Sequence, residues 1–164
     1  MGAVNVRTPV VLISLLAVLG LAAPATAAQD RHAGYYYPEV TSREVYKARA
    51  KVLDEADRKA RIGFIVGMTE TQGTLPYPPT YAVIAKGEEA EKMIIIGLDG
   101  ESFRTLYRAR AMLGRLTAQA RSTTLFRRLA VEDYFTFFDL IRMLGFEQLT
   151  VSDGETYAHQ VTFE

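Results

Sequence analysis

The first 28 residues decide how much of this chain is available to fold. They combine one charged residue, Arg7, an apolar run over residues 10–23 and small residues at 25–27, which are the three parts of a secretory signal peptide. The apolar run has 14 residues, whereas a helix that spans a bilayer needs about 20. We therefore predict a signal peptide over residues 1–27, cleaved before Ala28, and a periplasmic or secreted protein.

Removal of the leader leaves 137 residues (164 − 27), enough for one domain. No arginine pair precedes the apolar run, which favours export of an unfolded chain by the general pathway. The remaining sequence has no second apolar run of about 18 residues, so we expect no membrane association after cleavage. We predict an extended N-terminal arm over 28–41 and a single α+β domain over 42–164.

The composition excludes several classes of site. The chain has no cysteine, which rules out disulfides, thiolate metal sites and a cysteine nucleophile. Its 49% hydrophobic content is sufficient for a buried core. Without Arg7 the net charge is 18 − 19 = −1, which argues against a nucleic-acid partner.

The first part of the domain contains two ambiguous segments. Residues 42–53 alternate in a way that suits a half-exposed strand, which we favour. The same residues also fit a helix with Thr41 and Glu44 as a capping box. Residues 54–61 predict a helical turn, and the apolar run 62–69 predicts a strand.

A loop over 71–79 follows, with three prolines that forbid a helix or an interior strand. We interpret it as a rigid connection, and a polyproline-type ligand segment is the alternative. Residues 81–86 and 92–98 predict a pair of strands. The second is apolar on both faces, which is typical of a central strand covered on both sides.

Two helices are predicted in the second half. In residues 102–121 an apolar stripe lies opposite Arg104, Arg108 and Arg115. These arginines are most simply a solvated face, and a basic ridge for a phosphate or carboxylate is the alternative. Residues 133–144 form an aromatic-rich helix that we expect to pack on the sheet and to end at Gly145 in a left-handed conformation.

The chain is predicted to end in a hairpin. A three-residue loop at 152–154, with Gly154 left-handed in a bulge, would place Leu149 and Val151 on the same face as Tyr157, Val161 and Phe163. The resulting fold class is α+β, with an antiparallel sheet of five to six strands and two packed helices.

Candidate sites for chemistry are few. His32 and His159 lack the spacing of metal ligands, so we predict no metal site and no cofactor. A hydrolase built on Ser152, Asp153 and His159 is not expected, because a hairpin would hold the serine and His159 roughly 20 Å apart. The best candidate for a binding cluster is Arg110, Asp153 and His159.

Several short segments together resemble a family of uncharacterised exported bacterial proteins often labelled molybdopterin-guanine dinucleotide biosynthesis protein A. They are Pro76-Tyr77-Pro78-Pro79, Ala85-Lys86-Gly87, Ala90-Glu91-Lys92, Tyr107-Arg108-Ala109-Arg110-Ala111, Val131-Glu132-Asp133, Met143-Leu144-Gly145-Phe146 and Ser152-Asp153-Gly154. The resemblance covers most of residues 28–164, and its label implies a guanylyltransferase that uses magnesium and GTP.

The residues themselves show no Gly-x-Gly-x-x-Gly motif, no Walker-type lysine loop and no nucleophile elbow. We therefore expect a non-catalytic binding or accessory module, whose partner is an unknown periplasmic protein or a small ligand. Guanylyl transfer in molybdopterin-guanine dinucleotide biosynthesis is the alternative that the resemblance implies.

Overall fold

The computed structural model of this protein describes residues 37–164. The predicted signal peptide (1–27) and most of the predicted arm (28–36) lie outside the described residues. The elements in chain order are β1 (Ser42–Tyr46), α1 (Arg58–Gly73), β2 (Tyr81–Lys86), β3 (Lys92–Gly97), α2 (Leu106–Arg121), α3 (Thr124–Leu129), α4 (Phe137–Met143), β4 (Gln148–Ser152) and β5 (Ala158–Phe163).

The five strands form one mixed sheet in the order β1-β5-β4-β3-β2. Pairs β2–β3 and β4–β5 are antiparallel, whereas β3–β4 and β1–β5 are parallel. The predicted α+β class is confirmed, but the expectation of an antiparallel sheet is wrong in part. The long connection through α2, α3 and α4 returns the chain to the same end of the sheet, so that β4 can run parallel to β3.

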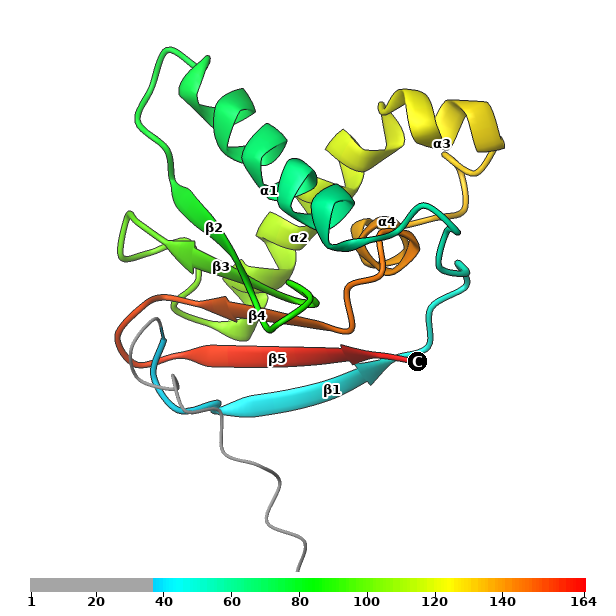
Figure 1. The fold of residues 1–164 in the computed structure, drawn as a ribbon. Helices are drawn as coiled ribbons and strands as arrows, with labels where there is room; N and C mark the ends of the chain where they lie inside the picture. Colours follow the sequence, from blue (N-terminus) through cyan, green and yellow to red (C-terminus); the bar gives the residue numbers. More distant parts are fainter. Residues whose placement is uncertain (1–36) are drawn as a thin grey trace, which may run out of the picture.

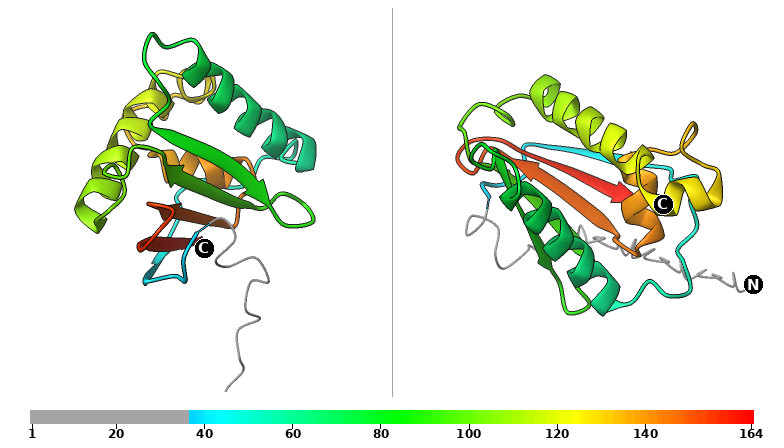
Figure 2. Two further views of the ribbon diagram at one scale, coloured as in Figure 1. Left: turned by 90° about the vertical axis from the view of Figure 1, so that its left-hand side faces the viewer. Right: turned by 90° about the horizontal axis from the view of Figure 1, so that it is seen from above.

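Helices α1, α2 and α4 lie over one face of the sheet (Figures 1 and 2). The main core is between this face and the helices, and the strand residues that alternate toward it include Met93, Ile95, Leu149, Val151, Val161 and Phe163. A second, smaller cluster lies on the opposite face, where Tyr37 packs with Ile94 and Ala158. The sheet is therefore covered on both sides at β3, as predicted for a central strand.

The prediction of a strand over 62–69 is wrong, because these residues lie inside α1. The Asp57 side chain accepts a hydrogen bond from the Ala60 N–H and starts the helix. Phe64 and Met68, one helical turn apart, pack against the core, while Gly63 and Gly67 take the adjacent positions. Two glycines in a short apolar run resemble a strand with a bulge, and this hid the helical period.

The other local predictions hold with shifted boundaries. Residues 42–46 form β1, so the strand interpretation is confirmed there and the helix alternative is wrong. Strands 81–86 and 92–97 are confirmed. Helix α2 begins after Thr105 rather than at residue 102, and α3 was not predicted.

The predicted helix over 133–144 is confirmed in part, since α4 covers only 137–143. Its capping box pairs Thr136 with Asp139, which is fully buried. Tyr134 belongs to the helix predicted to pack on the sheet, but it is 65% exposed because it precedes α4. Gly145 has φ +80°, which confirms its left-handed conformation.

In the terminal hairpin the strand side chains lie on the predicted faces of the sheet, but the loop is longer than predicted. Val151 pairs with His159 and Ser152 with Ala158, which leaves residues 153–157 as the connection. The loop is two residues longer than predicted, and an even shift keeps the same faces toward the core. Gly154 is left-handed (φ +81°), as predicted.

Candidate functional site

Cavities lie on both sides of α2, and the larger one is a groove of about 680 Å³. It is bounded by α1, by α2 and by the proline-containing segment 74–80, with Tyr81 of β2 and residues of α4 contributing to its lining. Figure 2, seen from above, shows α1 and α2 diverging over the sheet rather than packing along their length.

Two glycines of α1 line this groove without projecting a side chain into it. Gly63 and Gly67 both line it, four residues apart and therefore on one face of the helix. A Cβ atom added at either position would meet no heavy atom within 4 Å. The groove is therefore open beside these two glycines, where the helix carries no side chain.

The groove is mainly apolar, but several polar side chains line it without a hydrogen-bond partner among the described residues, and Gln72, Tyr81 and Arg115 are three of them. Gln72 is 7% exposed, and its amide makes no hydrogen bond with any described residue. The Tyr81 hydroxyl and the Arg115 guanidinium also have no hydrogen-bond partner within residues 37–164. Burial raises the pKa of Tyr81, and the nearby Arg115 charge opposes this effect.

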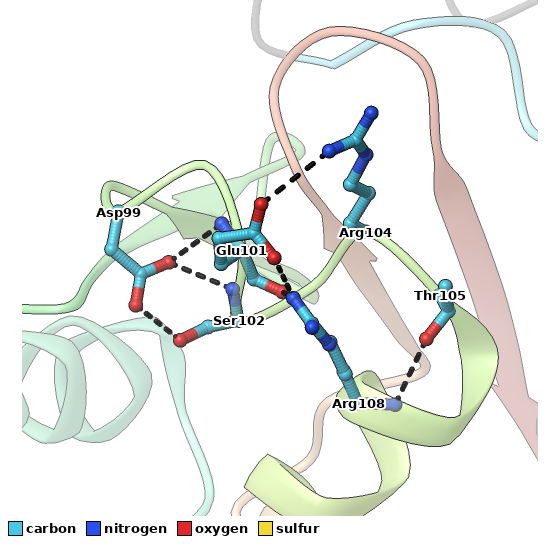
Figure 3. Close-up of polar contacts among 6 residues, drawn as sticks. All are labelled: Asp99, Glu101, Ser102, Arg104, Thr105 and Arg108. Carbon is cyan, nitrogen blue, oxygen red and sulfur yellow. Dashed lines mark hydrogen bonds and ion pairs between the residues drawn. The ribbon is translucent and has the colours of Figure 1, made fainter.

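The loop between β3 and α2 provides an acidic partner for Arg104 and Arg108 but not for Arg115 (Figure 3). The Glu101 carboxylate forms ion pairs with both Arg104, at 3.4 Å, and Arg108. Asp99 accepts hydrogen bonds from the Ser102 hydroxyl and N–H, which hold the pKa of its carboxyl below the ordinary value. The arginines on the predicted solvated face are thus exposed, but two of them are already neutralised.

The second cavity, of about 280 Å³, lies between the other side of α2 and β1. Its polar wall contains Glu44, Arg110 and His159. Glu44 Oε2 lies 3.3 Å from Arg110 Nη2 and 3.4 Å from His159 Nε2. Ser42 Oγ lies 2.7 Å from the other ring nitrogen, Nδ1, of this 4% exposed histidine.

Arg110 and His159, two of the three residues predicted to converge, therefore do so through Glu44. The sequence did not indicate Ser42 or Glu44, because they join the cluster through the parallel pairing of β1 with β5. Their alternate positions in a strand were the available signal, since they share one face.

Asp153 has a different role, at the hairpin loop. Its carboxylate accepts hydrogen bonds from three backbone N–H groups, of residues 155–157, and from the Thr156 hydroxyl. Burial acts to raise the pKa of Asp153, but these hydrogen bonds outweigh it and hold the pKa below its ordinary value. The structure therefore does not place Asp153 in direct contact with Arg110 or His159.

The Tyr157 hydroxyl is buried without a hydrogen-bond partner among the described residues. Burial raises the pKa of this hydroxyl, and Ser42, Arg110 and Glu44 are among the groups that influence it. Tyr157 therefore adds a further polar atom near the Ser42–Glu44–His159 cluster.

The expected separation of about 20 Å between Ser152 and His159 is wrong. They occupy neighbouring positions of the β4–β5 pair rather than points about 20 Å apart along an extended hairpin. Ser152 faces the side of Ala158, whereas His159 faces the side of Val151, so the two side chains are on opposite faces of the sheet. The Ser152 hydroxyl accepts a hydrogen bond from the Gly154 N–H.

Within residues 37–164, no group of three or more histidine, aspartate or glutamate side chains is arranged to hold a metal ion. None of the helices in this part of the chain is long and apolar enough to cross a membrane. Comparison with family models, curated proteins and solved structures finds no match to this chain.

Proposed function

We propose that this protein is a non-catalytic binding module whose ligand occupies the groove between α1 and α2. The observation that supports this most strongly is the lining of the groove, which is mainly apolar and includes Arg115, a charged side chain that forms no ion pair or hydrogen bond with any described residue. Gln72 lines the groove as well, and its amide has no hydrogen-bond partner among the described residues. A bound ligand would supply partners for both side chains.

The size and lining of the groove support a small molecule rather than a large partner. Its volume of about 680 Å³ lies within the usual range of ligand pockets, about 300–1,000 Å³. Aromatic and aliphatic side chains, including Phe64, Met68 and Phe137, line it beside a few polar groups. This is the combination that binds a mainly apolar molecule in one orientation.

Fluorescence titration with N-phenyl-1-naphthylamine, an uncharged apolar dye, tests the proposal. We expect the dye to bind with enhanced emission and the Gly67→Leu variant, whose side chain fills the groove, to bind at least tenfold more weakly. Gly114→Leu is the matched control, because Gly114 lies on α2, faces the second cavity and is also free of contacts within 4 Å. Absence of dye binding, or equal losses in both variants, would refute the groove as the ligand site.

We also propose that the protein acts in the periplasm or outside the cell after loss of residues 1–27. The support is the signal-peptide pattern of the N-terminus. The intact mass of the protein recovered from the periplasm tests it. A mass that corresponds to a chain starting at Ala28 is expected, and a full-length protein confined to the cytoplasm would contradict it.

A second candidate function is ester or amide hydrolysis, supported by the Ser42–His159–Glu44 arrangement. A nucleophile within hydrogen-bond reach of a base, oriented by a third group, is the signature of an activated serine. Labelling with a fluorophosphonate probe and mapping of the modified peptide tests this function. Label on Ser42 that is lost in Ser42→Ala would support a hydrolase, and an unlabelled protein would remove it.

Guanylyl transfer remains the alternative implied by the family resemblance. Its structural support is the parallel pair β3–β4, since nucleotides bind at the carboxyl ends of parallel strands. Equilibrium dialysis against GTP and Mg²⁺ tests it. Binding at micromolar GTP would support the alternative, and no binding would remove it.

A further inference from the structure

We propose that the groove ligand is a linear aliphatic anion whose acidic end binds Arg115. This inference rests on the proposed function, because it names the chemistry of the ligand in the same groove. It follows that neutral or cationic molecules of the same chain length are not the preferred ligands.

The charge of the groove supports an anion. Arg115 is the only charged side chain among the described residues that line it, and no carboxylate shares the lining. Arg104 and Arg108 are compensated by Glu101, whereas Arg115 forms no ion pair or hydrogen bond with any described residue. An uncompensated guanidinium beside apolar surface attracts a carboxylate or phosphate group.

Asp99 is an acid that experiences the charge of Arg115, but this charge lowers the pKa of its carboxyl less than the hydrogen bonds from Ser102 do. Asp99 is committed to the loop, since it accepts hydrogen bonds from the backbone N–H groups of Glu101 and Ser102. The guanidinium therefore remains available to a bound anion.

Two further donors line the same groove. Gln72 offers a buried amide, and Tyr81 offers a hydroxyl whose pKa is raised by burial, so it stays protonated at neutral pH. Tyr81 lies close enough to Arg115 to experience its charge. An acid group bound to Arg115 can accept a hydrogen bond from the tyrosine as well.

The rest of the groove fits an aliphatic chain. Met68, Met112 and Leu116 line it together with aromatic rings, and the glycine face of α1 leaves the space open. Methionine side chains adapt to flexible apolar ligands. Each methylene buried there adds favourable transfer free energy, so a long chain binds more tightly than a short acid.

The test compares three twelve-carbon probes by displacement of N-phenyl-1-naphthylamine: dodecanoate, dodecanol and dodecyltrimethylammonium. Because Arg115 is exposed, we expect dodecanoate to bind about fivefold more tightly than dodecanol, the range of a solvent-accessible charge interaction. The cationic probe should bind most weakly. Raising the salt concentration from 50 to 500 mM should reduce the preference, since it screens exposed charges.

Variants separate the charge from the fold. Arg115→Gln should reduce the preference for dodecanoate over dodecanol from about fivefold to less than twofold. Arg128→Gln is the control, because it removes the same charge from an exposed position of α3 outside the groove. It should leave the preference intact.

The outcomes distinguish this inference from the proposed function. Equal binding of dodecanoate and dodecanol, or an unchanged preference in Arg115→Gln, would overturn the anionic ligand and leave the groove as a binding site. Failure of the dye and of all three probes to bind would refute the proposed function itself. A fivefold preference lost only in Arg115→Gln would support both.

Discussion

Replacing Gly63 and Gly67 with alanine should stabilise the protein. Both positions lie inside α1, where glycine is about 1 kcal/mol less favourable than alanine. A Cβ atom at either site meets nothing within 4 Å, so no steric cost offsets the gain. The double variant should gain about 1–2 kcal/mol in the free energy of unfolding.

Urea denaturation followed by far-ultraviolet circular dichroism measures this gain, with the midpoint shifted to higher urea and an unchanged slope. Gly114→Ala is the control for propensity alone, because Gly114 lies inside α2 and its Cβ is equally free of contacts. It should gain about 0.5–1 kcal/mol. Unfolding of the double variant at the same or lower urea concentration than the wild type would refute an open glycine face on α1.

Four further changes test individual contacts. Asp139→Asn should lower the free energy of unfolding by about 2–4 kcal/mol, because the buried carboxylate accepts hydrogen bonds from backbone N–H groups that an amide nitrogen cannot accept; a loss below 1 kcal/mol in urea would contradict this. Asp153 has a lowered pKa, so its stabilisation is complete above the unfolded value of about 3.9 and is lost as the pH falls through the folded value. The stability difference between wild type and Asp153→Asn should therefore shrink between pH 5 and pH 2, whereas a constant difference would show that ionisation is irrelevant. Gly145→Ala should lower the melting temperature, since the left-handed backbone costs about 1–2 kcal/mol and the new Cβ would approach Nη1 of buried Arg61 at 2.6 Å; an unchanged melting temperature would argue against this conformation. Gln72→Leu should weaken dodecanoate binding and leave the stability of the ligand-free protein within about 0.5 kcal/mol of the wild type, because the amide has no hydrogen-bond partner among the described residues, and calorimetry that shows a strongly destabilised variant would assign the amide a structural role.

Local sequence patterns predicted much of the fold. Gly145 and Gly154 were identified as left-handed turn residues because few other residues adopt that conformation. The apolar run at β3 and the amphipathic stripe of α2 identified a covered strand and a helix over the core. The main error, the strand predicted within α1, arose where two glycines interrupted the helical period.

The candidate site was less predictable. Arg110 and His159 both lie beside Glu44, and this link depends on β1 lying beside β5. Asp153 was assigned to the same cluster, whereas its hydrogen bonds serve the hairpin loop. The groove between α1 and α2 was not predicted. Gly63 and Gly67, which line its α1 side, lie in the apolar run that was predicted to be a strand.

Local sequence patterns are sufficient to predict the α+β class, the β2–β3 strand pair, helix α2 and the turns at Gly145 and Gly154. They do not predict the parallel pairings of β1–β5 and β3–β4, because these pairings join residues far apart in the chain. The tertiary structure also distinguishes Arg115 from Arg104 and Arg108, which the helix predicted over 102–121 placed on one face with it. Periodicity reports which face a residue occupies, but the charge that meets that face depends on which other segments fold against it.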